Sequence, residues 1–355
     1  MAGRRARLSP SEWVVLARQG ILDLLEVEHA AVWDEIEAKI ADVRWPTLET
    51  HIDPHHLSTA RRQLIEEELV ADVEEPTRGG RPIGVFHRTD LPKRKTSISR
   101  AAQRKRLLQA RYQRWGFGDK STAALLGSSG ERVVRASLEV AAAKAGMMPI
   151  QGDFRPVSKV LGMPISGPFD NGVYMPSLGA DDMPGSTVTV PIEVKNRRTW
   201  IYPNSDQLYQ LLAKSAALQA AKPDYPIVPV LVCRRRHITT QKMARQLGFF
   251  VVEAKHQFID WPETEDVRLL EEVRDELGYL DLVNQAGPSD NVQGYLAKGL
   301  PKILLEQAER WAHFGPKLKP YFDHLRREIA GNSRAKFMNE FRQAAVDLGA
   351  TERGW

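Results

Sequence analysis

Cysteine and long apolar runs are both scarce in this sequence. The only cysteine among the 355 residues is Cys233, so neither an intrachain disulfide nor a cysteine-based zinc cluster can form. No uninterrupted apolar run approaches the roughly 20 residues that a transmembrane helix needs. The first residues, MAGRRARLSPSEW, are charged and lack the apolar stretch of a signal peptide. We therefore expect a cytoplasmic protein without a membrane segment, in which Cys233 is a buried thiol.

Charge of one sign is not strongly in excess over the whole chain, but it is concentrated locally. The formal net charge is +5. Between residues 93 and 120 the only acid is Asp119, and the basic residues are Lys93, Arg94, Lys95, Arg100, Arg104, Lys105, Arg106, Arg111, Arg114 and Lys120. A polyphosphate partner favours such a stretch, because each neutralised phosphate releases condensed counterions. The other interpretation is a solvated basic linker.

The first ninety residues predict three helices and a hairpin. Ser9 and Glu12 have the spacing of a capping box at the start of an amphipathic stretch over residues 9–25. A second stretch covers residues 28–43, and Asp53-Pro54 supplies an N-cap and a first-turn proline for a third helix, over residues 54–70. The runs VADVEE and PIGVFHR flank Gly79-Gly80 and predict two strands joined by a turn.

This order of elements resembles the winged-helix family over about residues 9–90. The resemblance implies that the third helix enters the major groove of double-stranded DNA, with its N-terminal half contacting bases and the wing tip contacting phosphates or the minor groove. The residues expected at the DNA are His55, His56, Ser58, Thr59, Arg61 and Arg62 on the helix, Arg78 and Arg81 at the wing tip, and Arg104, Lys105 and Arg106 in the basic stretch. A winged helix used for protein contacts or dimerisation is the alternative.

From about Ser128 to Phe258 strands and helices alternate. Residues 129–146 form a helix pattern closed by Gly146, and the runs MMPIQGDFRPV, GPFDNGVYM and STVTVPIEVKN predict three successive strands. A helix over SDQLYQLLAKSAALQAAK, a buried strand over YPIVPVLVC, a further helix and the strand FFVVEA follow. The expected order is αβββαβαβ.

Two opposite charges share one face of the third predicted strand. Residues alternate across a strand, so Glu193 and Lys195 point away from the side occupied by Ile192 and Val194. Asp170, in the preceding strand run, comes beside Glu193 if the two strands pair. Two carboxylates and a lysine would then meet at one sheet edge.

Such a group suits phosphodiester hydrolysis. Mg²⁺ takes oxygen ligands from a few carboxylates and keeps positions for water and a phosphate. Asp170 and Glu193 supply such ligands, and the backbone carbonyl of Val194 is the expected third. The metal ion, Mg²⁺ or Mn²⁺ in its place, lowers the pKa of a bound water, while Lys195 orients that water and offsets transition-state charge.

These residues and the element order resemble the PD-(D/E)xK nuclease superfamily over about residues 128–258. The resemblance implies a restriction endonuclease-like αβββαβ core, a metal-site role for Glu131 on the first helix and a contact from Gln207 on the helix after the E-x-K strand. The sequence departs from the motif at Phe169, where the family has proline. The long insertion before Glu193 also contains Asp181 and Asp182, either of which is the metal ligand if the alignment is shifted.

We therefore expect an α/β protein of four parts. They are a winged helix over residues 1–92, a basic linker or helix over 93–127, a nuclease core with a central mixed sheet over 128–259 and a helical C-terminal region over 260–355. By analogy, that last region is the expected site of a homodimer contact.

The function expected from these patterns is a Mg²⁺-dependent DNA endonuclease, in restriction or another defence against foreign DNA. Three alternatives stay open: a DNA-binding regulator with a catalytically silent nuclease-like domain, a structure-specific nuclease of junctions, repair or transposition, and an RNA nuclease.

Overall fold

The chain divides into two compact units, which we describe separately. The first comprises Met1–Leu125 and Trp261–Leu282, and the second comprises Leu126–Asp260 and Val283–Trp355. The computed structural model describes residues 8–43, 45–48, 50–76, 82–91, 95–117, 125–178, 184–327, 331–351 and 355. In these residues no helix has the length and apolar character needed to span a membrane.

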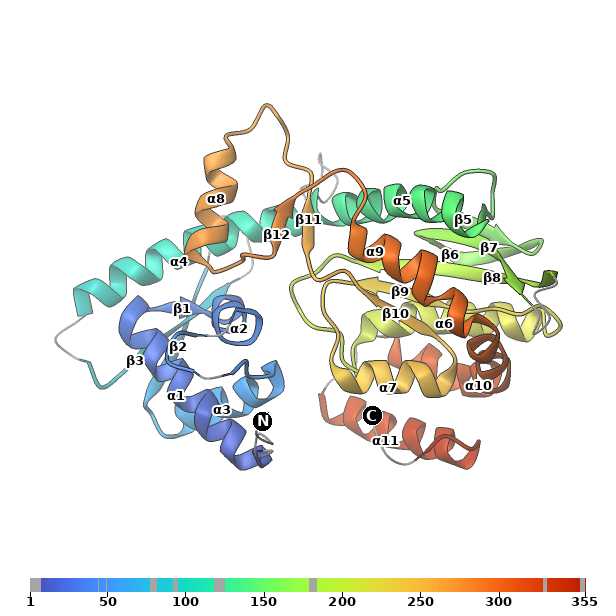
Figure 1. Ribbon diagram of the computed structural model, residues 1–355. Coiled ribbons are helices and arrows are strands. Elements are labelled where there is room, and N and C mark those ends of the chain that lie inside the picture. The colour runs from blue at the N-terminus through green and yellow to red at the C-terminus, as the bar shows by residue number, and fades with distance from the viewer. Residues whose placement is uncertain are drawn as a thin grey trace, which may run out of the picture. The chain divides into compact units, whose positions relative to one another are not determined.

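The first unit contains a small antiparallel sheet, in the order β1-β3-β2, and six helical segments. Its elements are α1 (Pro10–Glu28), β1 (Ala31–Val32), α2 (Trp33–Glu37), the π-helix η1 (Ala38–Asp42), α3 (Pro54–Glu66), β2 (Val70–Glu75), β3 (Ile83–Arg88), α4 (Lys95–Phe117) and α8 (Val267–Glu276). Strand β3 pairs with both neighbours, with Val85 opposite Val32 and Val73. Figure 1 shows α4 beside this small sheet and α8 next to α4.

The capping residues predicted in the first ninety residues lie at the observed starts of α1 and α3. The capping box forms: the Ser9 hydroxyl accepts from the Glu12 amide (3.3 Å), and the Glu12 carboxylate accepts from the Ser9 amide (2.6 Å). Asp53 is the N-cap residue of α3 and Pro54 is its first residue. The expected second helix is instead divided into β1, α2 and η1. The two-residue strand β1 is too short to be recognised from residue periodicity.

The second unit is built on a five-stranded mixed sheet with the order β10-β9-β8-β7-β4. Its elements are α5 (Leu125–Ala145), β4 (Met148–Pro149), β5 (Val157–Val160), β6 (Met163–Phe169), β7 (Asn171–Leu178), β8 (Pro184–Lys195), α6 (Asp206–Ala221), β9 (Val230–Cys233), α7 (Ile238–Leu247), β10 (Phe250–Glu253), β11 (Gln257–Ile259), β12 (Leu282–Asn284), α9 (Asp290–Gly294), η3 (Tyr295–Gly299), η4 (Pro301–Ile303), α10 (Leu304–Leu325) and α11 (Gly331–Asp347). Strands β8, β9 and β10 are parallel, and β7 and β4 run antiparallel to their neighbours. The expected mixed α/β architecture and the helical C-terminal region are confirmed.

Two apolar cores cover the two faces of this sheet. Leu231 and Cys233 of β9 pack into one core with α6, α7, α10 and α11, while Val230 and Val232 pack into the other with α5 and α9. Figure 1 shows α5 on one side of the sheet and α6 and α7 on the other. A strand buried on both faces needs a continuous apolar sequence, and PIVPVLVC provides one.

The segment before the E-x-K strand differs from the sequence prediction. The run MMPIQGDFRPV is expected to be one strand, but it contains the two-residue strand β4, then turns, and ends on Val157, the first residue of β5. Strands β5 and β6 form a separate hairpin, and Asp170 lies between β6 and β7. Glycine explains the hairpin turn, because Gly162 has φ +80°, a conformation that side chains with a Cβ seldom adopt.

Candidate active site and nucleic-acid interface

Sheet register brings Asp170 beside the E-x-K strand. Asn171, the first residue of β7, pairs with Ile192 of β8, so Asp170 lies next to Glu193 across the strands. Oδ2 of Asp170 accepts a hydrogen bond of 2.6 Å from the backbone amide of Val194. The two carboxylates therefore meet at the end of β8, as the alternation of the sequence predicts.

Two lysines neutralise the Glu193 carboxylate, which is only 5% exposed. Nζ of Lys195 lies 2.9 Å from Oε1, and Nζ of Lys214 lies 2.7 Å from Oε2. Lys214 also donates to the carbonyl of Pro168 (2.8 Å) and lies over the ring of Phe169. The ammonium group of Lys214 thus links α6 to the segment that carries Asp170.

Lys214 was not predicted from the sequence. Gln207 was the expected contact from α6, and it lies half-buried in the first turn of that helix. Lys214 is seven residues later, about two turns along the same face, and it is the side chain that α6 brings to Glu193. That spacing is the signal that could have found it. Tyr209, two residues after Gln207, is fully buried in the core.

Burial and like charge make the site hard to ionise. Burial, with the neighbouring charge of Glu193, raises the pKa of Asp170 to about 6, although the Val194 amide and Lys195 act in the opposite direction. Burial also raises the pKa of Glu131, and Glu193 adds to that shift. A hydrogen bond and an ion pair join the segment of Asp170 to Val194 and Lys195 to Glu193, and Glu131 lies within electrostatic range of Glu193 and Lys195.

Close packing of α5 against the end of β8 fixes the local backbone. A Cβ atom at Gly130 would lie 2.4 Å from Cβ of Asn196, so only glycine fits at this position. The Asn196 amide donates to the carbonyls of Leu126 and Phe258 (both 2.6 Å) and accepts from the Phe258 amide (2.9 Å). Lys195, which immediately precedes Asn196, is thereby held at a defined place beside α5.

The donor set suits a hard divalent cation. Carboxylate oxygens of Asp170, Glu193 and Glu131 are the ligands that Mg²⁺ prefers, and a cation among them would relieve their mutual repulsion. A metal ion on Glu193 would take the place of at least one of its two ammonium contacts. Whether the Val194 carbonyl joins the ligands stays a prediction. Asp181 and Asp182, the alternative ligands, lie outside the described residues.

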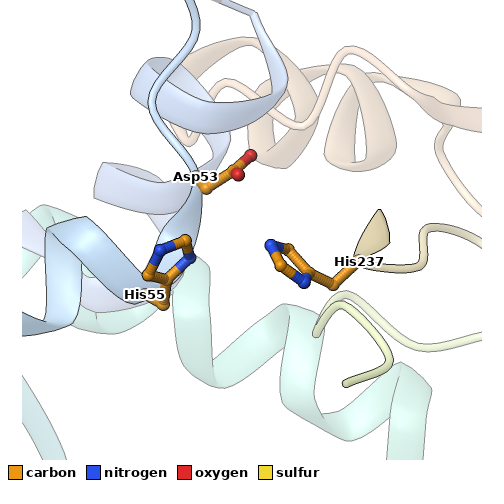
Figure 2. Close-up of side chains that lie close together, drawn as sticks. All are labelled: Asp53, His55 and His237. Atoms are coloured by element: carbon orange, nitrogen blue, oxygen red, sulfur yellow. The ribbon is translucent and has the colours of Figure 1, made fainter. Parts of the chain in front are cut away.

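A second group with metal-ligating atoms does not define a site. Figure 2 labels Asp53 and His55, at the start of α3, and His237, at the start of α7. The first two residues belong to one unit and His237 belongs to the other, and the two units are not placed relative to one another. We therefore assign no metal site to these three residues. Within its own unit, His237 stacks on Tyr202.

The predicted DNA-reading face of α3 is partly solvent-accessible. His55, Ser58 and Arg62 are exposed, whereas His56, Thr59 and Arg61 are half-buried. The guanidinium of Arg61 lies 4.6 Å from the ring of Trp33, which orients it by a cation–π contact. Four of these residues line a groove of about 490 Å³: Ser58, Thr59, Arg61 and Arg62. Arg78 and Arg81, the expected wing-tip contacts, lie outside the described residues.

Three basic residues of α4 that were expected at the DNA form ion pairs inside the first unit. Arg104 forms ion pairs with Glu272 and Glu276 of α8, and Arg106 pairs with Glu75 (2.8 Å).

Lys105 is only 5% exposed and binds Glu35 (2.5 Å) and Glu28 (3.0 Å). These basic side chains of α4 thus form ion pairs with acidic residues that are distant in the chain. We therefore leave Arg104, Lys105 and Arg106 out of the proposed DNA interface.

Comparison of the chain with protein-family models, with curated proteins and with solved structures gives no match. Arguments about function therefore depend on the residues and their geometry.

Proposed function

We propose that the second unit is a metal-dependent nuclease and that it hydrolyses phosphodiester bonds of DNA at Asp170, Glu193 and Lys195. The observation that carries this proposal is the meeting of Asp170 and Glu193 beside a lysine at the end of β8. Asp170 is half-buried and Glu193 is buried, and the pKa of Asp170 is raised even with the lysines nearby, so a divalent cation would stabilise this pair of acids. A scaffold has no need of such an arrangement, whereas a metal site does.

Each residue has a chemical role in this proposal. Asp170 and Glu193 would hold Mg²⁺, with Glu131 as a further acid at the same edge. The metal ion polarises the scissile phosphate and lowers the pKa of a bound water. Lys195 would orient that water and offset the charge that builds on the phosphate oxygens. Lys214 would hold Glu193 in place from the opposite side.

The element order also supports the finer fold assignment. The elements of the five-stranded sheet and its flanking helices follow the order α5, β4, β7, β8, α6, β9, with the β5-β6 hairpin inserted before β7, and this order is consistent with the αβββαβ succession of the restriction endonuclease-like core. The helices α1, α2 and α3 followed by the antiparallel pair β2-β3 are consistent with the order expected for a winged helix, to which β1 adds a short third strand, and such a domain would bind duplex DNA through α3. Defence against foreign DNA is the role we favour, and a homodimer through the C-terminal helices remains a proposal by analogy.

Cleavage assays test this function. Plasmid, linear, branched and single-stranded DNA are incubated with the protein in Mg²⁺, Mn²⁺ or EDTA, beside Asp170→Ala and Lys195→Ala. We expect metal-dependent cleavage that both variants lose while they still bind DNA. A parent that binds DNA and cuts none of these substrates would instead support the regulator with a silent nuclease-like domain.

A further inference from the structure

Basic residues follow each of the three parallel strands at the edge that carries the candidate site. Strands β8, β9 and β10 run in the same direction, so their carboxyl ends share one edge of the sheet. Ligands of open α/β sheets bind outside the carboxyl ends of parallel strands. The basic residues there are Lys195 at the end of β8, Arg197 and Arg198 after β8, Arg234, Arg235, Arg236 and His237 after β9, and Lys255 and His256 after β10.

Backbone hydrogen bonds hold these three segments together. The Ile201 amide donates to the carbonyl of Arg235 (3.0 Å), and the His237 amide donates to the carbonyl of Ile201 (2.9 Å). The Lys255 amide donates to the carbonyl of Arg234 (3.0 Å). Lys195, Arg234 and His256 line one small pocket at this edge. The charges are therefore presented by a fixed surface and not by independent loops.

The arginines divide into a buried set and a solvent-facing set. Arg198 and Arg234 are buried, and Arg234 donates to the carbonyl of Arg198, which braces the two segments. Arg236 pairs with Glu253 at 2.9 Å. By contrast, Arg197 and Lys255 are exposed, and the Arg235 side chain is 29% exposed, 3.9 Å from Glu253.

The charge balance of this edge favours a polyanion. Glu131, Asp170 and Glu193 would repel a nucleic-acid backbone that approached them alone. Adjacent cations on β8, β9 and β10 offset that repulsion and attract phosphates. Three strands about 4.8 Å apart span about 10 Å, which matches about three axial steps of 3.4 Å along one DNA strand, that is, about four successive phosphates.

We propose that Arg197, Arg235 and Lys255 form a binding surface for the phosphodiester backbone of DNA, which runs from the carboxylate site across the ends of β8, β9 and β10. The surface directs one strand of the substrate to Lys195, independently of base sequence. This inference deepens the proposed function and rests on it for the identity of the ligand.

The test measures binding of a 30-base-pair duplex by fluorescence anisotropy, in EDTA and over a series of NaCl concentrations. An Arg197→Ala/Lys255→Ala variant removes two exposed cations, so its fold is retained. Lys317→Ala/Lys336→Ala, in α10 and α11, makes the same change of net charge elsewhere on this unit. Arg235→Lys is compared with Arg235→Ala to separate loss of charge from loss of shape.

We expect the first variant to reduce the slope of log affinity against log salt by roughly two and to weaken binding at least tenfold at 0.1 M salt. The control pair leaves the slope unchanged, and Arg235→Lys binds more tightly than Arg235→Ala. The proposed binding surface is wrong if the slope of Arg197→Ala/Lys255→Ala equals that of the parent, or if the parent does not bind DNA.

Cleavage in Mg²⁺ separates this inference from the proposed function. If the parent cuts DNA but Arg197→Ala/Lys255→Ala has the same salt dependence of binding as the parent, the nuclease proposal stands and the proposed binding surface is wrong. If Arg197→Ala/Lys255→Ala reduces the slope but the parent does not cut DNA, the binding surface stands and the nuclease proposal is wrong.

Discussion

Oδ2 of Asp170 lies 2.6 Å from the backbone nitrogen of Val194, the residue between Glu193 and Lys195. This hydrogen bond joins the segment between β6 and β7 to the end of β8. It also fixes one oxygen of the carboxylate, so the acid is oriented before any ligand binds. Preorganised charge of this kind costs stability in the free protein and reduces the reorganisation needed in the bound state.

The first prediction concerns the stability cost of Asp170. Burial and Glu193 raise the pKa of this carboxyl from 3.8 to about 6 in the folded protein. Ionisation is therefore harder when folded, so the free energy of unfolding falls as pH rises from about 4 to about 6 and stays lower above that. Asp170→Asn keeps an acceptor for the Val194 amide without the charge. In EDTA at pH 7.5 we expect it to be more stable than the parent by on the order of 2 kcal/mol, measured by urea unfolding.

In Mg²⁺ we expect the parent to be more stable than Asp170→Asn. A cation bound to the folded state stabilises the parent in proportion to its occupancy and leaves Asp170→Asn nearly unchanged. Asp224→Asn, at an exposed acid of the same unit, serves as the control and should behave like the parent. A parent that is as stable as Asp170→Asn at pH 7.5 in EDTA contradicts the strained pair of acids.

Lys214 gives a second prediction. Replacement by Met removes the ammonium group that lies 2.7 Å from Glu193 and 2.8 Å from the carbonyl of Pro168. A buried carboxylate that loses one of its cations destabilises the fold, and we expect a loss of about 2 kcal/mol in EDTA. Mg²⁺ should recover part of this loss because it supplies another cation. Equal losses with and without Mg²⁺ would show that Lys214 and the metal ion do not share Glu193.

A third prediction tests the buried charges of the first unit. Glu35 is fully buried and binds Lys39 (2.7 Å) and Lys105 (2.5 Å), and burial raises its pKa. Lys105→Met leaves that carboxylate with one cation fewer, and we expect it to destabilise the unit by about 3–5 kcal/mol. Arg114→Ala, at an exposed position of the same helix, should change stability by less than about 0.5 kcal/mol. Circular dichroism during urea unfolding measures both, and a Lys105→Met variant as stable as Arg114→Ala would refute the structural role.

The sequence identified the local parts of the candidate site and missed its long-range parts. Strand alternation placed Glu193 and Lys195 on one face, and the strand order placed Asp170 next to them, because neighbouring strands in sequence usually pair. Lys214 was missed because a helix offers several polar side chains, and its rotation about its axis is set by tertiary packing.

The basic stretch over residues 93–120 is a second case in which the sequence does not reveal long-range contacts. Charge density along the chain cannot reveal whether a helix faces solvent or meets distant acids. Arg104 binds Glu272 and Glu276, which belong to the first unit although the chain passes through residues 126–260 of the second unit before it reaches them. Glu35 lies 70 residues before its partner Lys105. No local pattern links such pairs, so the sequence predicted a phosphate contact where the structure has internal ion pairs.

A fourth prediction addresses the proposed DNA-reading helix. Arg62 is exposed on α3 and lines the groove there. Arg62→Ala should weaken duplex binding about fivefold or more, since each side chain at a DNA groove or phosphate contributes on the order of 1–3 kcal/mol. Arg268→Ala, at an exposed arginine of α8, is the matched control. If Arg62→Ala and Arg268→Ala bind duplex DNA with equal affinity, α3 is not part of the DNA interface.

Single-turnover cleavage of a DNA duplex tests the central claim most directly. The parent and Glu193→Gln are compared in Mg²⁺ with protein in excess, after urea unfolding and anisotropy have shown that both fold and bind DNA. The account predicts metal-dependent strand scission by the parent, stopped by EDTA, and a rate at least 100-fold lower for Glu193→Gln. Cleavage at the same rate by both proteins, or by neither, would contradict it.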